Sequence, residues 1–74
     1  MSEVRENVRR AIRAIIDVYE HGNAAAFGRR LNVSRQTVSN WLNGWSCPDI
    51  EMVALICRVY GVDGNWMLLG DIDD

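Results

Sequence analysis

The chain has 74 residues, 49% of them hydrophobic, and a formal net charge of −2. This length allows one small domain with a modest core, and no apolar run in the sequence approaches the length of a membrane span, which argues against a membrane protein. The first ten residues, MSEVRENVRR, are too charged for a secretory signal. We therefore expect a cytoplasmic protein in which Cys47 and Cys57 are free thiols.

Charge is divided unevenly along the chain. Residues 1–47 hold seven Arg and four acidic residues, a net charge of +3, whereas residues 48–74 hold one Arg and six acidic residues, a net charge of −5. Every basic residue is Arg, a side chain suited to bidentate recognition of phosphates and guanine edges. The overall negative charge therefore does not exclude a nucleic-acid partner for the first two thirds of the chain.

Residues 3–20 have the pattern of an amphipathic helix, with Ser2 as its N-cap and His21-Gly22 at its end. Its expected buried face carries apolar residues three and four positions apart: Val4, Val8, Ala11, Ile12, Ile15 and Tyr19. His21, the only His, is interpreted as a solvated residue at the helix end rather than a catalytic one.

Arg5, Arg9 and Arg13 lie four residues apart on another side of this first helix. Glu6 and Asp17 are within pairing distance of the arginines on the same helix. We interpret this surface as a solvated face with ion pairs, and a phosphate-binding stripe is the alternative.

Two short helices are expected next, over residues 24–31 and 35–42. Asn23 and Ser34 are suitable N-caps, Asn32 is suited to a left-handed turn, and Gly44 ends the second of the two helices. Gly28 lies inside the first of them, where Gly costs about 1 kcal/mol relative to Ala. We therefore expect another part of the chain to pack closely against Gly28.

The stretch NVSRQTVSNWLNG, residues 32–44, combines two apolar residues with short polar side chains that are poor helix formers. At 100° per residue, Val38 and Trp41 share one face of helix 35–42, directed at the preceding helix. The opposite face gathers donors and acceptors without Glu or Lys: Arg35, Gln36, Ser39, Asn40 and Asn43. The order of helix, short turn and helix is that of a helix-turn-helix, and base edges require this kind of outward face.

A loop with Pro48 follows, then a fourth helix capped by Asp49 and a short fifth helix after Asp63 or Asn65. The expected buried stripe of the fourth helix is Ile50, Val53, Ala54, Cys57 and Tyr60. Trp45, in the loop, is expected to fold against the core. Stacking on a sugar-phosphate edge and contact with a second subunit are the alternatives for Trp45.

The segments NAAAFGRRLNVSRQTVSNWLNG and YGVDGNWMLLGD resemble the Cro/cI-type, or xenobiotic-response-element, helix-turn-helix family of phage repressors and related regulators. The resemblance covers residues 23–70. It implies an all-α fold, a compact bundle of about five short helices like the lambda-repressor DNA-binding domain. The corresponding division is a DNA-binding domain at 1–70, with its helix-turn-helix core at 23–44, and an acidic tail at 71–74 or the start of a linker to a missing C-terminal domain.

The resemblance also implies which residues meet DNA, with helix 35–42 in the major groove. The base-reading residues would be Arg35, Gln36, Ser39 and Asn40. The residues that contact the DNA backbone would be Asn23, Ala24, Ser34, Thr37, Asn43 and Ser46. Ala24 stands where family members often have a phosphate-binding Gln, and Trp45 and Ser46 stand where their loop is commonly basic, which implies weak nonspecific binding and a shallow salt dependence.

The sequence therefore predicts a sequence-specific regulator, of the phage-repressor type, that binds an inverted-repeat operator in double-stranded DNA as a homodimer. The alternative is a protein-interaction module, antitoxin-like or adaptor, whose partner surface is formed by Trp66, Leu68, Leu69 and Ile72. An enzyme, a metal site and a cofactor are not expected, because one His and no cluster of ligands or nucleophiles leave no chemistry to assign.

Overall fold

Five α-helices account for most of the computed structural model, which describes residues 3–70. Their bounds are α1 Glu3–Tyr19, α2 Ala24–Leu31, α3 Arg35–Asn43, α4 Ile50–Tyr60 and α5 Gly64–Leu69. No strand occurs among the described residues, so the predicted all-α fold with about five short helices is confirmed. Ser2, the expected cap of α1, and the acidic tail at 71–74 lie outside the described residues.

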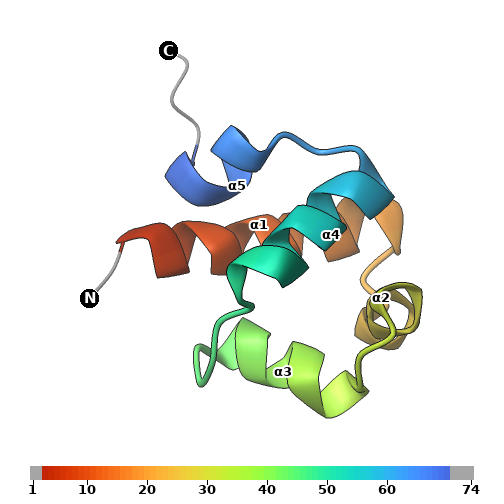
Figure 1. The fold of residues 1–74 in the computed structure, drawn as a ribbon. Helices are drawn as coiled ribbons and strands as arrows, with labels where there is room; N and C mark the ends of the chain where they lie inside the picture. The colour runs from red at the N-terminus through yellow and green to blue at the C-terminus, as the bar shows by residue number, and fades with distance from the viewer. Residues whose placement is uncertain (1–2, 71–74) are drawn as a thin grey trace.

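The helices surround α1, the longest of them, which crosses the middle of the molecule (Figure 1). α5 lies on one side of α1 and α3 on the other (Figure 1), and α4 packs against α2 and α5. α1 packs against α5 and α3, and α2 packs against α3 and α4. Arg35, Gln36 and Asn43 of α3 are exposed, so no other helix covers the outer surface of α3.

Each helix contributes at least one almost completely buried side chain to a single core. These residues include Ile12 from α1, Phe27 from α2, Val38 from α3, Ile56 from α4 and Met67 from α5. Burial of such a side chain stabilises the fold by roughly 1.5–3 kcal/mol. The core therefore depends on all five helices rather than on the helix-turn-helix alone.

The predicted buried faces of α1 and α4 were wrong at some positions. In α1, Val4 and Tyr19 are exposed, whereas Ile16, one turn after Ile12, is buried. The neighbouring helices cover only the central turns of α1, and the chain returns after residue 20 on the Ile16 side. In α4, Ile50 and Ala54 are exposed because they lie one turn apart on the side away from α1 and α2.

Side chains at the start of four helices accept backbone N–H groups, as the sequence predicted. Asn23, Ser34, Asp49 and Asp63 cap α2, α3, α4 and α5, so Asp63 rather than Asn65 is the cap of α5. Each cap satisfies a donor that has no acceptor within its own helix. The short helices α2 to α5 therefore start at positions fixed by local sequence.

A polar contact that the sequence did not reveal links α1, α2 and α4. The Glu20 carboxylate is 8% exposed; it accepts a hydrogen bond from the Tyr60 hydroxyl (O–O 2.7 Å) and forms an ion pair with Arg30. The Tyr60 ring also stacks on Phe27 with 5.5 Å between ring centroids. Hydrogen bonds from Tyr60 and Arg30 hold the pKa of Glu20 below its ordinary value of 4.5, although desolvation acts in the opposite direction.

Candidate nucleic-acid interface

The position of α3 relative to α2 is fixed by close packing at Gly28. A Cβ atom added to Gly28 would lie 2.9 Å from the backbone oxygen of Val33 and 3.3 Å from Cγ2 of Val38. The Val33 N–H in turn donates to the Gly28 carbonyl oxygen at 2.9 Å. The expected close approach to Gly28 is therefore confirmed, and any side chain there would push the turn and α3 away from α2.

The turn between α2 and α3 is determined by two polar residues. Asn32 has the left-handed conformation, with φ 60° and ψ 41°, as predicted. Ser34 then accepts the backbone N–H of Thr37 at 3.0 Å, and the two hydroxyl groups lie 2.9 Å apart. These bonds fix the first turn of α3, which ends at Asn43, one residue beyond the predicted end.

The two faces of α3 differ as the sequence predicted. Val38 and Trp41 are buried against the core. On the opposite side the side chains of Arg35, Gln36 and Asn43 are exposed, and those of Ser39 and Asn40 are partly exposed. Arg35 is the only charged residue of α3, so this outward face offers neutral amides and hydroxyls with one cation at its start.

Hydrogen bonds between side chains order this outward face. The Gln36 Nε2 amide donates to Asn40 Oδ1 at 3.0 Å, and the Asn43 Nδ2 amide donates to Ser39 Oγ at 3.4 Å. Both bonds join residues four apart, which are neighbours on a helix surface. In this arrangement the side-chain oxygen of Gln36 (Oε1) and the side-chain NH2 group of Asn40 remain available to a ligand. The face therefore presents an acceptor and donors side by side.

The start of α2 supplies backbone donors beside this face. The Asn23 side chain accepts the N–H of Ala26 at 3.0 Å, and the Asn23 carbonyl accepts the N–H of Phe27 at 3.2 Å. The N–H groups of Ala24 and Ala25 precede these and have no acceptor within the helix. With the positive end of the helix dipole, they form a small donor site suited to an anion.

The loop after α3 corrects the expectation for Trp45, which is 80% exposed rather than folded against the core. Gly44 has the left-handed conformation, and the N–H groups of Trp45 and Ser46 both return to the Asn40 carbonyl oxygen, at 2.9 Å and 3.3 Å. This tight turn directs Trp45 to solvent, and Cys47 packs against the core in its place. Ser46 is exposed on the same turn.

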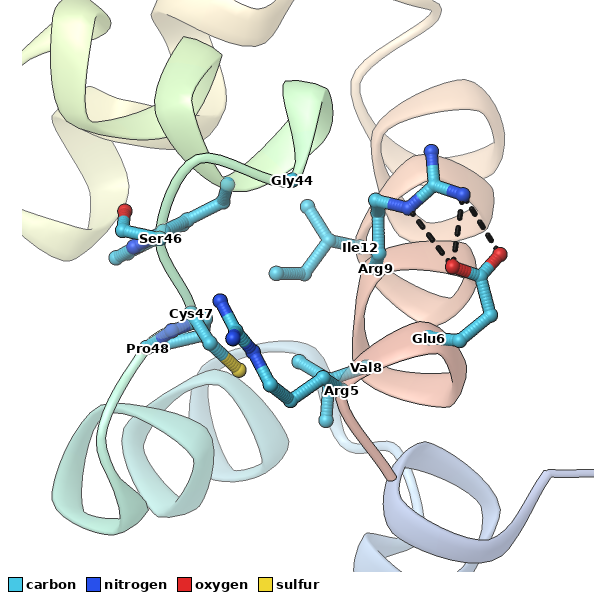
Figure 2. Close-up of a pocket in the computed structure, with 10 residues that line it drawn as sticks. Arg5, Glu6, Val8, Arg9, Ile12, Gly44, Ser46, Cys47 and Pro48 are labelled. Atoms are coloured by element: carbon cyan, nitrogen blue, oxygen red, sulfur yellow. Dashed lines mark hydrogen bonds and ion pairs between the residues drawn. The ribbon is translucent and has the colours of Figure 1, made fainter. Parts of the chain in front are cut away.

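A cleft of about 310 Å³ separates this loop from the first half of α1 (Figure 2). Figure 2 shows the Arg5 side chain extending toward Cys47 and Pro48 across the cleft. Arg9, also on the cleft, donates to the Glu6 carboxylate at 2.7 Å and to the Leu42 carbonyl near the end of α3 at 3.5 Å. α1 therefore brings Arg9 beside the end of α3 and Arg5 beside the loop that follows, positions that the sequence pattern had not indicated.

The predicted ion pairs on α1 are present at Glu6. Its carboxylate pairs with Arg9 at 2.7 Å and with Arg10 at 3.3 Å. The hydrogen bond from Arg9 holds the pKa of Glu6 below its ordinary value. This part of α1 thus has the paired, solvated surface that the sequence predicted.

Three further observations bear on other kinds of site. Within residues 3–70, no helix is long and apolar enough to cross a membrane. The same residues contain no group of three or more His, Cys, Asp or Glu side chains placed to hold a metal ion. Burial raises the pKa of the Cys57 thiol, whose sulfur lies 3.5 Å from that of Met67, so Cys57 packs at the edge of the core as expected.

Comparison with known protein families matches residues 22–67 to a helix-turn-helix family. The chain belongs to the Cro/C1-type helix-turn-helix family. The match spans α2, the turn, α3, α4 and the first residues of α5, so it covers the geometry described above as well as the motif. No curated protein and no solved structure gave a match.

Membership of this helix-turn-helix family makes the chain a DNA-binding domain of the kind found in transcription regulators. The residues that the sequence assigned to DNA lie in three neighbouring places: the start of α2, the first turn and outward face of α3, and the loop at 44–46. Sequence reasoning included Arg5 and Arg9 only in an alternative phosphate-binding stripe, and it did not place Arg9 at the end of α3 or Arg5 beside the loop. Their spacing on α1 was visible, but the path of the loop across α1 was not.

Proposed function

We propose that this chain is a sequence-specific transcriptional regulator of the phage-repressor type, which places α3 in the major groove of an inverted-repeat operator. The observation that supports this proposal most strongly is the outward face of α3, which carries amides, a hydroxyl and one Arg but no carboxylate. An α-helix fits the major groove, where each base pair presents its own pattern of donors and acceptors. An uncharged polar face can match such a pattern without repelling the phosphates on either side.

Base reading is assigned to four side chains of α3. Arg35, exposed at the start of the helix, suits the O6 and N7 acceptors of guanine, and Gln36 or Asn40 suits adenine. The bond between Gln36 and Asn40 holds these two amides as one unit before DNA arrives. Ser39, one turn before Asn43, completes the set.

Phosphate contacts are assigned to groups on both sides of α3. At one side are Asn23 and the N–H of Ala24 at the start of α2, together with the hydroxyls of Ser34 and Thr37. At the other side are Asn43 and Ser46. These groups are uncharged, so we expect weak nonspecific binding and a shallow dependence of affinity on salt.

Two copies of the chain are proposed to bind one operator as a homodimer, because helix-turn-helix domains of this type read half-sites about one turn of DNA apart. Each half-site alone offers few charged contacts. Affinity therefore depends on both copies binding together.

Selection of bound duplexes from a random-sequence DNA pool tests this function. We expect enrichment of an inverted repeat, with binding to the selected sequence that is stronger than binding to a scrambled duplex at two salt concentrations. Failure to enrich any sequence, with only weak salt-sensitive binding, would contradict the proposal.

A protein-interaction module is the second candidate, favoured by an apolar groove between α1 and α5. A cavity of about 320 Å³ there is lined by apolar side chains that include Val18, Tyr19 and Trp66, and Leu69 nearby is exposed. Replacement of Arg35 and Asn40 by Ala separates the two candidates. Unchanged DNA affinity in that double variant, with retained binding of a protein partner, would favour the interaction module.

A further inference from the structure

Two unusually exposed apolar side chains follow α3 closely in the sequence: Trp45 in the loop and Ile50 as the first residue of α4. Trp45 is 80% exposed and Ile50 is 74% exposed, the highest values among the large hydrophobic residues that the structure describes. Trp45 is the second residue after α3, and the loop that carries it leads directly into α4, which begins at Ile50. Single exposed hydrophobic residues are ordinary, but two at the end of a helix that reads DNA indicate a contact surface.

The charges around this surface favour a protein partner over DNA. Asp49 and Glu51, on either side of Ile50, are both exposed, and their carboxylates would repel the phosphates of a DNA backbone. Arg5 reaches the same loop from α1, at Cys47 and Pro48 (Figure 2). The surface therefore combines an apolar centre with charges of both signs, which is what a patch needs in order to pair with a second copy of itself.

We propose that Trp45 and Ile50 form the contact between two copies of this chain bound to adjacent half-sites, an inference that rests on the proposed function. In an inverted repeat, the two-fold axis brings the same end of both recognition helices toward the centre of the operator. At the other end of α3 lies the turn with Asn32 and Ser34, whose exposed side chains are polar. The apolar end of α3 is therefore the end that faces the second copy.

The small area of this surface predicts how strongly two copies associate. A buried aromatic side chain contributes about 150–250 Å², and a stable interface buries about 800 Å² on each partner. One Trp and one Ile from each copy fall well below that area. The chain is therefore a monomer in dilute solution, and the contact appears as cooperative binding to the operator, with the second copy bound roughly 5–150 times more tightly than the first.

The test compares a duplex that holds one half-site with a duplex that holds the full inverted repeat. Trp45→Ser and Ile50→Ser are expected to bind the half-site as the unmodified chain does and to lose about tenfold or more of the cooperativity on the full repeat. Val59→Ser is the matched control, because Val59 is also β-branched and is 41% exposed, but lies near the other end of α4. It should keep the cooperativity.

The proposed orientation of α3 relative to the centre of the operator provides a second readout. Replacing Arg35 should change base preference in the outer part of each half-site, and replacing Asn40, more than one turn further along α3, should change it closer to the centre. The reverse order would overturn the inference.

Three other results would also overturn the inference. They are binding of the unmodified chain without cooperativity, full cooperativity in both variants, and a fall in half-site affinity with cooperativity intact, which would make Trp45 a DNA contact. If the proposed function itself fails, the unmodified chain will not distinguish the half-site from a scrambled duplex. That outcome differs from each of these three.

Discussion

α1 and α3 are both amphipathic helices that bury one face in the same core, yet their outer faces differ in chemistry. The outer face of α1 carries long charged side chains, and Glu6 pairs there with Arg9 and Arg10. The outer face of α3 carries amides and hydroxyls that form hydrogen bonds with each other, at 3.0 Å and 3.4 Å. A charged face that pairs with itself suits solvent, whereas a neutral face with spare donors and acceptors suits a ligand that brings its own pattern.

The same comparison shows how α3 remains a helix. Exposed ion pairs such as those on α1 contribute about 0–1 kcal/mol each, and the Ser, Thr and Asn residues of α3 are weak helix formers. α3 depends instead on its cap at Ser34, its left-handed end at Gly44 and the burial of Val38 and Trp41. Its stability thus comes from its ends and its inner face, which leaves the outer face free for recognition.

The largest expected effect contrasts two double substitutions, one on each outer face. Arg35→Ala with Asn40→Ala should lower the affinity for the selected operator by about 100-fold or more, because each bidentate base contact contributes about 1–3 kcal/mol of discrimination. Arg10→Ala with Arg13→Ala removes two cations from α1 and should change that affinity far less. Fluorescence anisotropy with labelled operator measures both. Equal losses in the two variants would show that charge rather than the face of α3 determines binding.

The next effect concerns how α3 is held against α2. Gly28→Ala should lower the free energy of unfolding by up to about 2 kcal/mol, since an overpacking cost of about 1–3 kcal/mol is only partly offset by the gain of about 1 kcal/mol in helix propensity. Gly64→Ala is the control, because its Cβ would meet only Cys57 Sγ, at 3.9 Å. Urea denaturation gives both values. A Gly28 variant as stable as the Gly64 variant would contradict the close packing of α2 and α3.

A smaller effect concerns the first turn of α3. Ser34→Ala should cost about 1 kcal/mol of unfolding free energy, the usual contribution of an N-cap hydroxyl. Ser46→Ala, at an exposed loop position, should stay within about 0.5 kcal/mol of the original chain. Thermal and urea denaturation of the two variants test this difference. A loss in Ser46→Ala equal to that in Ser34→Ala would argue against the cap.

The smallest effect is a pH dependence that originates in Glu20, outside both outer faces. Because the folded-state pKa of Glu20 lies below its ordinary value of 4.5, its contribution to stability is present above that pH and is lost as the pH falls through the folded-state value. Tyr60→Phe removes the hydrogen bond that lowers this pKa most. The variant should therefore lose less stability on acidification than the unmodified chain does. Urea denaturation over a pH series measures how the unfolding free energy of each protein changes with pH. Equal changes in the two proteins would contradict the role given to the hydrogen bond between Tyr60 and Glu20.

The sequence predicted those parts of the fold that depend on local chemistry. Asn32 is left-handed because few other residues tolerate that conformation, Ser34 caps α3 because its hydroxyl reaches Thr37, and Gly28 allows close approach because it has no Cβ. Tyr19 and Ile50 were misplaced because periodicity gives the face of a helix but not how far its neighbours extend. The contacts of Glu20 join residues 10 and 40 positions away, which no local pattern reveals.

For the candidate site, too, the sequence predicted the features that depend on local chemistry but not those that depend on the tertiary structure. The composition of α3 was enough to predict its outward face, because Ser39 and Asn40 are unusual choices for an ordinary exposed helix. The bond between Gln36 and Asn40 depends on side-chain rotamers, and the place of Arg5 beside the loop depends on how α1 crosses the molecule. Trp45 turned outward because two backbone N–H groups share the Asn40 carbonyl, a contact that its residue type does not predict.

The claim that α3 reads base edges is tested most directly by repeating the random-pool selection with Gln36→Ala beside the unmodified chain. We expect both to enrich an inverted repeat of the same spacing, with the base preference of the variant lost at one or two positions in each half-site and kept elsewhere. Identical selected sequences from the two proteins would contradict the assignment of base reading to the outward face of α3.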